Sequence, residues 1–256
     1  MNKTDLIKIH HADYLDDIRF WTSWTEGKEP VLEVGCGHGR VVLPLLAAGR
    51  EVVGVDIDLP AIQSLRDELG NKEVDIQKRA RIIHENIVNF QPEGPFGAVI
   101  IPCNTFSTFP SEERQIIISK IYQLLALDGV FAVSMPNPAQ LRFLYEELKE
   151  NSNPEGPDLE TSFLHPETGF PVQVSSKVAA RENSLGWDWI YDHLHPDGQV
   201  ERVVQSTEHY LTTPEIYQQE LVSAGFDEIQ LMGDFDCSDY LEDSPYLILV
   251  GNKAEV

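Results

Sequence analysis

The sequence predicts an α/β fold: a doubly wound, mostly parallel sheet that carries a small antiparallel β insertion. Three observations predict it. In the first half of the 256 residues, short apolar runs alternate with segments of helical character. The first run, Val31–Val34, leads directly into the glycine-rich turn Gly35–Gly39 and then into an apolar helix. After residue 136 this alternation stops, and three consecutive β-like stretches follow.

The parallel part of the sheet is expected from five apolar segments in series. They are Val31–Val34, Glu51–Asp56, Arg79–His84, Gly97–Ile101 and Val130–Met135. Helices are expected between them, one of them over 61–69 and another over 111–125 with Ser111 as its N-cap. Apolar residues near helical spacing within 5–24 predict one or two helices before the first strand. Strand–helix units in this order form a parallel sheet with right-handed crossovers.

The insertion and the end of the chain have a different pattern. A helix over 137–150 and a loop over 151–169 are expected, followed by β-like stretches at 172–179, 187–194 and 200–210. Thr213 and Pro214 open a helix that ends at Gly225, and two last strands rejoin the main sheet. We therefore divide the chain into a core with N-terminal helices (1–136), a helix, loop and antiparallel lid insertion (137–211), and a C-terminal part of the core (212–256).

The composition excludes several classes of partner. Asp and Glu number 42 against 19 Lys and Arg, for a formal charge of -23. This charge disfavours nucleic acid and anionic membranes as partners. No apolar run has membrane-spanning length, and Met1–Leu6 lacks the features of a signal peptide, so we expect a cytoplasmic protein. Scattered cysteines and the spacing of the histidines suggest neither disulfides nor a metal site.

The glycine turn has the spacing G-x-G-x-G, which departs from the dinucleotide fingerprint because Arg40 stands where that fingerprint has its last glycine. Glu33 precedes the turn at the end of an apolar strand, where an unpaired carboxylate is costly. Asp56 ends the next strand about 20 residues after the first glycine, the spacing at which a carboxylate reaches ribose hydroxyls. The turn therefore predicts a nucleotide-sized site.

These motifs, in this order, resemble those of class I S-adenosylmethionine-dependent methyltransferases, and more closely the small-molecule enzymes with a short antiparallel lid, such as sugar-amine N,N-dimethyltransferases. The matching stretches are Glu33-Val34-Gly35-Cys36-Gly37-His38-Gly39, Gly54-Val55-Asp56, Glu85-Asn86-Ile87-Val88-Asn89-Phe90 and Ile101-Pro102-Cys103-Asn104-Thr105-Phe106. Asn86 departs from the family's commoner Asp. The resemblance implies a Rossmann-like methyltransferase sheet whose last strand is antiparallel, and S-adenosylmethionine as the cofactor.

The resemblance assigns a set of cofactor-binding residues. They are Glu33, Gly35, Cys36, Gly37, Gly39, Asp56, Ile57, Asn86, Ile87 and Pro102. Glu33 is expected at the methionine amino end of the cofactor or as a support of the glycine turn, and Asp56 at the ribose. Ile57 and Ile87 are expected to enclose the adenine, as apolar walls of such pockets do, and Asn86 to accept a hydrogen bond from its amino group.

Three residues are predicted to lie near the reacting groups: Asn104, Tyr14 and Tyr191. Asn104 follows the fourth strand, at the edge where open α/β sheets bind ligands. Tyr14 either closes over the cofactor or packs on the core. Tyr191 shares a face of the insertion with Trp187, Trp189 and His193, and this face either roofs an acceptor pocket or forms a homodimer contact.

The function that these residues predict is methyl transfer from S-adenosylmethionine to a small-molecule acceptor, with an amine favoured, by in-line displacement. Such a reaction depends on alignment and exclusion of water rather than on a protein nucleophile. The sequence singles out no general base. Two alternatives remain at this point: an NAD-dependent oxidoreductase, and a non-catalytic S-adenosylmethionine-binding partner protein. No nucleic acid, membrane or metal is expected in any of them.

Overall fold

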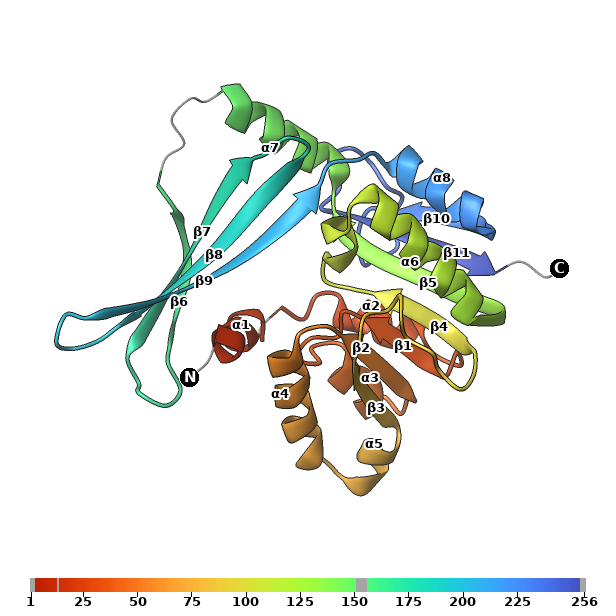
Figure 1. Ribbon diagram of the computed structural model, residues 1–256, viewed down its shortest axis with the longest axis horizontal. Coiled ribbons are helices and arrows are strands. Elements are labelled where there is room, and N and C mark those ends of the chain that lie inside the picture. The colour runs from red at the N-terminus through yellow and green to blue at the C-terminus, as the bar shows by residue number, and fades with distance from the viewer. Residues whose placement is uncertain (1–2, 13, 151–155, 254–256) are drawn as a thin grey trace. The chain divides into compact units, whose positions relative to one another are not determined.

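A computed structural model of the chain describes residues 3–12, 14–150 and 156–253. These residues form two compact units (Figure 1). One unit, here the sheet unit, takes its described residues from 14–138 and 212–256, and the other, here the lid unit, takes them from 1–13 and 139–211. None of the described helices has the length and hydrophobicity to cross a membrane.

The sheet unit contains a seven-stranded sheet in the order β10-β11-β5-β4-β1-β2-β3. Its strands are β1 (Val31–Val34), β2 (Val52–Asp56), β3 (Ala80–His84), β4 (Phe96–Ile101), β5 (Leu125–Pro136), β10 (Phe226–Met232) and β11 (Tyr246–Lys253). The first five pair in parallel, while β11 is antiparallel to both β5 and β10. The expected fold class, with its antiparallel last strand, is confirmed.

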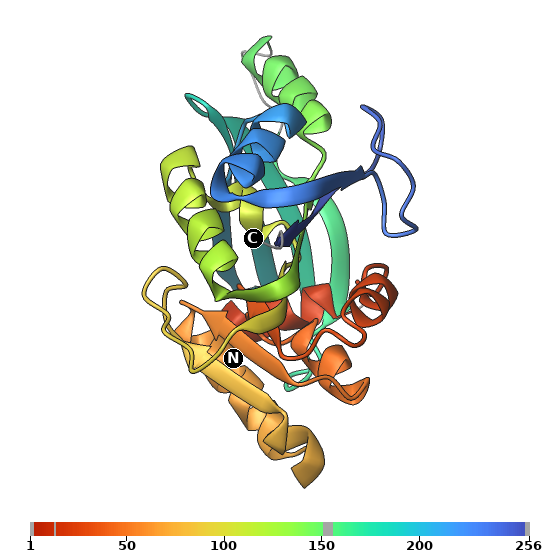
Figure 2. The same ribbon diagram turned by 90° about the vertical axis from the view of Figure 1, so that its right-hand side faces the viewer.

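Helices cover both faces of this sheet; Figure 2 shows α6 on one side of it and α2 on the other. The helical elements of the unit are α2 (Ile18–Trp24), α3 (Val42–Ala47), α4 (Leu59–Gly70), α5 (Val74–Lys78), the 3-10 turn η1 (Thr105–Thr108), α6 (Ser111–Leu124) and α8 (Pro214–Ala224). Alternate residues of a strand enter opposite apolar clusters: in β1, Leu32 packs with residues of α6 and Val31 with residues of α2 to α4. Both faces of the central strands are therefore buried, which explains their continuous apolar runs.

Two capping predictions had different outcomes. Thr213 caps α8 as expected, since its side chain accepts a hydrogen bond from Ile216 N. Ser111 was expected to cap α6, but Pro110 occupies that position and the Ser111 hydroxyl donates to Glu220 Oε1 at 3.0 Å. Ser111 is already the first helical residue after the extended Pro110, so its hydroxyl pairs with a carboxylate from α8 instead of capping the helix N–H groups. The short helix α5 was not predicted.

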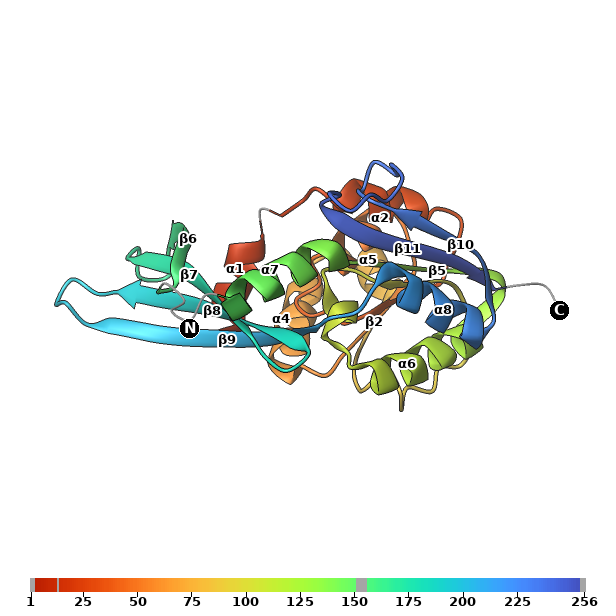
Figure 3. The same ribbon diagram turned by 90° about the horizontal axis from the view of Figure 1, so that it is seen from above.

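The lid unit is built on a four-stranded antiparallel sheet in the order β6-β7-β8-β9. Its elements are α1 (Lys3–His11), α7 (Pro138–Glu150), β6 (Asp158–Leu164), β7 (Pro171–Ala180), β8 (Ser184–Leu194) and β9 (Val200–Tyr210). In Figure 3, β8 and β9 run side by side. The predicted loop over 151–169 lies outside the described residues at 151–155. It is wrong for β6, because nearly all side chains of this edge strand are exposed and show no alternation that would predict a strand.

Helix α1 groups with the lid unit, whereas the sequence placed it in the core region 1–136. Its Leu6 is buried against Val172, Val174 and Tyr191 of the lid sheet. A second apolar cluster joins α7 to the same sheet through Leu141. An N-terminal helix with one apolar stripe packs on any apolar sheet face within reach, and the stripe itself does not specify which one.

Candidate functional site

The glycine turn follows β1 and is shaped by left-handed backbone angles. Gly37 and Gly39 have φ of +48° and +85°. A Cβ on Gly39 would lie 2.3 Å from Leu65 Cδ1, so this glycine permits the turn to pack against α4. A Cβ on Gly37 would meet nothing closer than Asp56 Oδ2 at 4.0 Å. The space above Gly37 is therefore open to a ligand, with the Asp56 carboxylate as its nearest protein neighbour.

Asp56 connects the glycine turn to the loop after β2. Its Oδ2 accepts a hydrogen bond from Gly37 N at 2.7 Å, and its Oδ1 accepts one from Asp58 N at 2.8 Å. A carboxylate has about four acceptor positions, so these two bonds leave acceptor capacity for ligand hydroxyls. Asp58 itself caps α4 by accepting from Ala61 N at 3.1 Å. The position and orientation of the Asp56 carboxylate are thus set by backbone donors.

Glu33 is a carboxyl group buried without a complete set of partners. The residue is 2% exposed, and its Oε2 has no hydrogen-bond partner within the described part of the chain. Burial raises the pKa of the Glu33 carboxyl well above its usual range, although the Arg40 guanidinium acts in the opposite direction. A cationic ligand group beside Oε2 would restore the charged form, because a buried carboxylate needs a paired donor.

A pocket of about 200 Å³ opens at the carboxyl ends of the parallel strands. Its lining residues are Val34, Gly35, Val55, Asp56, Ile57, Glu85, Asn86, Ile87, Thr105, Thr108, Phe109, Glu113 and Ile117. Ile57 is 70% exposed in this lining, so its side chain offers apolar surface that a flat ligand can cover. The pocket brings together Gly35, Asp56, Ile57, Asn86 and Ile87 of the residues that the sequence proposed.

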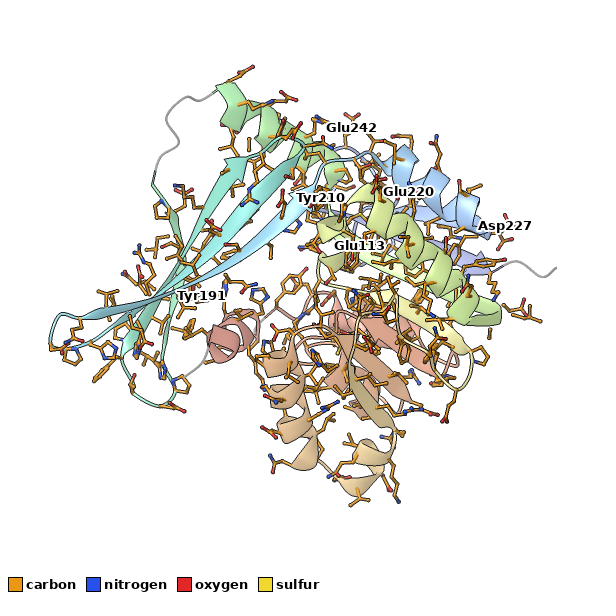
Figure 4. All side chains as sticks on the ribbon, in the orientation of Figure 1. Glu113, Tyr191, Tyr210, Glu220, Asp227 and Glu242 are labelled. Carbon is orange, nitrogen blue, oxygen red and sulfur yellow. The ribbon has the colours of Figure 1, made fainter. Side chains whose placement is uncertain are left out.

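Several lining residues were not found from the sequence. Thr105 and Thr108 come from η1, and Glu113 comes from the first turn of α6 (Figure 4). Thr105 directly follows Asn104 within the fourth matching stretch, Ile101–Phe106, so that stretch contained it although it was not chosen as a site residue. Glu113 gives no comparable signal, because acidic residues are common in the first turn of any helix.

Cys36 and Pro102 lie in the motifs without lining this pocket. The Cys36 side chain is buried in the apolar cluster beneath the turn, and its Sγ lies 2.8 Å from where a Cβ on Gly54 would stand. Burial raises the pKa of the Cys36 thiol well above its usual range. Pro102 is buried at the end of β4. Both side chains therefore support the fold around the site.

Asn86 shapes its own loop. Its Oδ1 accepts a hydrogen bond from Val88 N at 2.9 Å, and its backbone N–H donates to Glu85 Oε1 at 2.9 Å. The oxygen expected to accept from a ligand is thus already part of an Asx turn. The amide NH₂ of Asn86 is left as the group that can serve a ligand as a donor.

Asn104 and Cys103 form a sharp left-handed turn after β4. Their φ angles are +64° and +62°, a conformation that costs free energy for residues with a Cβ. The turn is held by the Ser107 hydroxyl, which donates to Asn104 O at 2.8 Å. Because of these angles, the direction of the Asn104 side chain does not follow the alternation of β4. Backbone strain of this kind is often found at functional sites.

Tyr14 belongs to a polar network in the sheet unit. Its hydroxyl donates to Tyr246 Oη at 2.8 Å, and the Arg40 guanidinium lies 4.9 Å from its ring centre. Arg40 in turn donates two 2.6 Å hydrogen bonds to the buried carboxylate of Asp17. Burial and the bond to Tyr246 raise the pKa of Tyr14, so its hydroxyl stays a neutral donor and acceptor rather than a base.

Tyr191 lies in the lid unit and is fully buried there. Its hydroxyl is 3.1 Å from His10 Nδ1 of α1, and its ring packs in the apolar cluster with Val172 and Val174. Burial raises the pKa of the Tyr191 hydroxyl above its usual range. Within its own unit, Tyr191 thus connects α1 to β8.

Comparison with known proteins finds that the chain is similar to methyltransferases. A family model described as a methyltransferase domain matches residues 31–129. A protein of Geobacillus sp. (strain WCH70) named as a methyltransferase is 26% identical over 232 residues, which cover 89% of this chain and 86% of that protein. A carboxy-S-adenosyl-L-methionine synthase of Histophilus somni (strain 129Pt) is 25% identical over 218 residues, with 82% of this chain and 73% of that protein covered.

The fold has close counterparts among solved structures. The sugar N-methyltransferase KedS8 from Streptoalloteichus sp ATCC 53650 superposes with a TM-score of 0.73 at 15% sequence identity. The superposition covers 99% of this chain and 94% of that one. The match therefore extends over both the sheet unit and the lid unit of this chain.

Proposed function

We propose that this chain is a class I S-adenosylmethionine-dependent methyltransferase whose acceptor is an amine on a small molecule. The matching methyltransferase-domain model and the related Geobacillus protein support the first part of this proposal. The observation that carries this proposal is the fold likeness to a sugar N-methyltransferase over 99% of the chain, insertion included. The formal charge of -23 supports it, since an acidic protein attracts cationic molecules such as amines.

The glycine turn fits the methionine end of S-adenosylmethionine. We assign the unpartnered Glu33 Oε2 to the cofactor's amino group, a cation that satisfies a buried carboxylate. The open space above Gly37 admits the cofactor close to the main chain. Gly35 and Gly39 give the turn the left-handed angles that this shape requires.

The pocket fits the nucleoside end of the cofactor. In this proposal Asp56 accepts from the ribose hydroxyls with its remaining acceptor positions, while Ile57 and Ile87 enclose the adenine. Asn86 donates through its NH₂ to a ring nitrogen, while its oxygen accepts from Val88 N. Glu113, half-buried on the same pocket wall, is an acceptor suited to the adenine amino group.

When bound, S-adenosylmethionine supplies a methyl group that its sulfonium charge has already activated. The chain's own residues are then needed for positioning and for excluding water. We assign positioning of the acceptor to Asn104, on its left-handed turn, and to the Tyr14 hydroxyl, which Tyr246 orients. Tyr191 is assigned no such part, since its side chain is fully buried within the lid unit.

The test is a panel of amino sugars and other small amines, each with its hydroxyl counterpart, incubated with enzyme and S-adenosylmethionine and analysed by mass spectrometry. We expect amines to gain one methyl group while S-adenosylhomocysteine accumulates. Methylation of the hydroxyl counterparts alone would contradict the amine assignment.

Glu33→Gln is expected to weaken S-adenosylmethionine binding about tenfold to a hundredfold, because a hydrogen bond to a charged group contributes about 1.5–3 kcal/mol. It should also stabilise the ligand-free protein at neutral pH. The raised pKa of Glu33 means that the folded form holds its proton more tightly than the unfolded form, so wild-type stability falls as pH rises above the ordinary carboxyl pKa. Glutamine does not titrate, so the variant should not show this loss of stability with rising pH.

Calorimetry with S-adenosylmethionine, and urea unfolding at acidic and neutral pH, measure both effects of Glu33→Gln. Glu51→Gln is the matched control, since it makes the same change at an exposed residue just before β2. Affinity equal to that of the control variant would show that Glu33 does not contact the cofactor.

A further inference from the structure

The turn between β8 and β9 brings two histidines and a glutamate together. His193 on β8 is the register partner of Glu201 on β9. His195 follows two residues after His193, and two backbone bonds close the turn beyond it, from His195 N to Gln199 O and from Gly198 N to His195 O. Residues two apart on a strand share a face, so all three side chains gather on one side of the hairpin, whose strands run together in Figure 3.

Their ligating atoms are close enough to share an ion. One such atom from each side chain lies within 4.8 Å of the others. Glu201 Oε2 is 3.9 Å from both His193 Nδ1 and His195 Nε2. Ligands of a tetrahedral zinc ion, at about 2.0–2.1 Å from the metal, lie roughly 3.4 Å from one another. The observed distances exceed those of the zinc geometry, so the side chains have to move closer together around the ion. Glu201 and His195, at 65% and 29% side-chain exposure, have the freedom to do so.

The surroundings hold His193 in a ligating orientation. Its side chain is 6% exposed, and its Nε2 is hydrogen-bonded to Thr168 Oγ1 at 2.9 Å. The ring also stacks on His165 with the ring centres 4.3 Å apart. With Nε2 engaged by Thr168, Nδ1 is the nitrogen that faces Glu201. Metal-bound histidines are held in the same way, through a hydrogen bond at the nitrogen opposite the metal.

A cavity of about 130 Å³ adjoins these side chains. His165 stabilises its wall, since its Nδ1 accepts hydrogen bonds from Glu167 N and Thr168 N at 3.2 and 3.3 Å. The cavity gives an ion and its water access to a cluster that is otherwise packed among aromatic rings.

We propose that His193, His195 and Glu201 form a binding site for a divalent transition metal ion, with zinc as the ion that the donors fit best. Two imidazoles and one carboxylate are a common zinc donor set, and three protein ligands leave one position for water. Bound zinc crosslinks the ends of β8 and β9 across their turn. The site lies within the lid unit and is independent of the proposed methyl transfer.

The test uses full-length enzyme freed of metal with a chelator, titrated with ZnCl₂ by calorimetry and with CoCl₂ by visible absorption. We expect one ion per chain and the strong d–d bands of tetrahedral cobalt. Glu201→Gln and His195→Asn are expected to weaken zinc binding more than tenfold. Glu182→Gln, the same charge change at an exposed residue before β8 of the same unit, is the matched control and should bind like wild type.

Thr168 provides a separate test of the positioning argument. Thr168→Val is expected to weaken zinc binding about tenfold, the lower end of the effect of removing an outer-shell partner, and Thr168→Ser should restore it. Circular dichroism and S-adenosylhomocysteine affinity report whether each variant is folded. Zinc binding to folded Glu201→Gln and His195→Asn as tight as to wild type, or a wild-type protein that yields no cobalt bands, would overturn the proposal.

Discussion

Gly37→Ala is expected to lower the affinity for S-adenosylmethionine by roughly a hundredfold, since an added methyl group in a filled space costs about 1–3 kcal/mol or more. The Cβ would enter open space, with the nearest protein atom 4.0 Å away. The methyl group therefore clashes with no protein atom, but it would occupy the space of a ligand bound on the turn. The cost to folding is limited to the left-handed angle, about 1–2 kcal/mol.

Gly49→Ala is the matched control for Gly37→Ala. Gly49 also has a left-handed φ, +89°, and a Cβ there would meet nothing within 4 Å. Both variants should lose similar stability in urea unfolding, and only Gly37→Ala should lose affinity in calorimetry with S-adenosylhomocysteine. If the two variants bind the ligand equally well, the glycine turn does not contact the cofactor and the assignment of the methionine end fails.

Glu220→Gln is expected to destabilise the sheet unit by about 3–5 kcal/mol, the usual effect of breaking a buried ion pair from one side. Arg114 Nε and Nη2 donate to the two oxygens of Glu220 at 2.5 and 2.7 Å, with side-chain exposures of 2% and 7%. Figure 4 labels Glu220 on α8. The variant leaves the guanidinium of α6 buried with a neutral amide in place of its counter-ion.

Urea unfolding measures this loss of stability. Asp75→Asn is the control, since it removes one partner of the exposed pair between Asp75 and Lys78 in the same unit. An exposed pair of this kind contributes about 0–1 kcal/mol. A loss as small for Glu220→Gln as for Asp75→Asn would contradict the importance of the buried pair between α6 and α8.

Much of the sheet unit follows from local sequence. An apolar run that ends in Gly35 predicts β1 and its turn, because strand period and glycine angles are properties of neighbouring residues. The methyltransferase-domain model that matches residues 31–129 agrees with this prediction. Local signals fail where side chains are solvated or have several acceptors: β6 was expected to be a loop, and Ser111 was expected to be a cap.

The residues of the candidate site divide in the same way. Asp56 was found by its distance along the chain from the glycine turn, since each strand–helix unit has a characteristic length. Glu113 was missed because only the packing of α6 beside the strand ends brings it to the pocket. Asn86 was found, but the engagement of its oxygen with Val88 N depends on the folded loop.

The sequence by itself determined the fold class, the order of the strands along the chain and the place of the glycine turn, because these depend on periodicity and on residues that are neighbours in sequence. The tertiary structure alone decided which charges are paired and which are not. Arg114 meets Glu220 across 106 positions, and Glu33 keeps an oxygen that has no partner among the residues that the structure describes. Such contacts depend on how segments that are distant in sequence pack together, and local sequence patterns do not encode that packing.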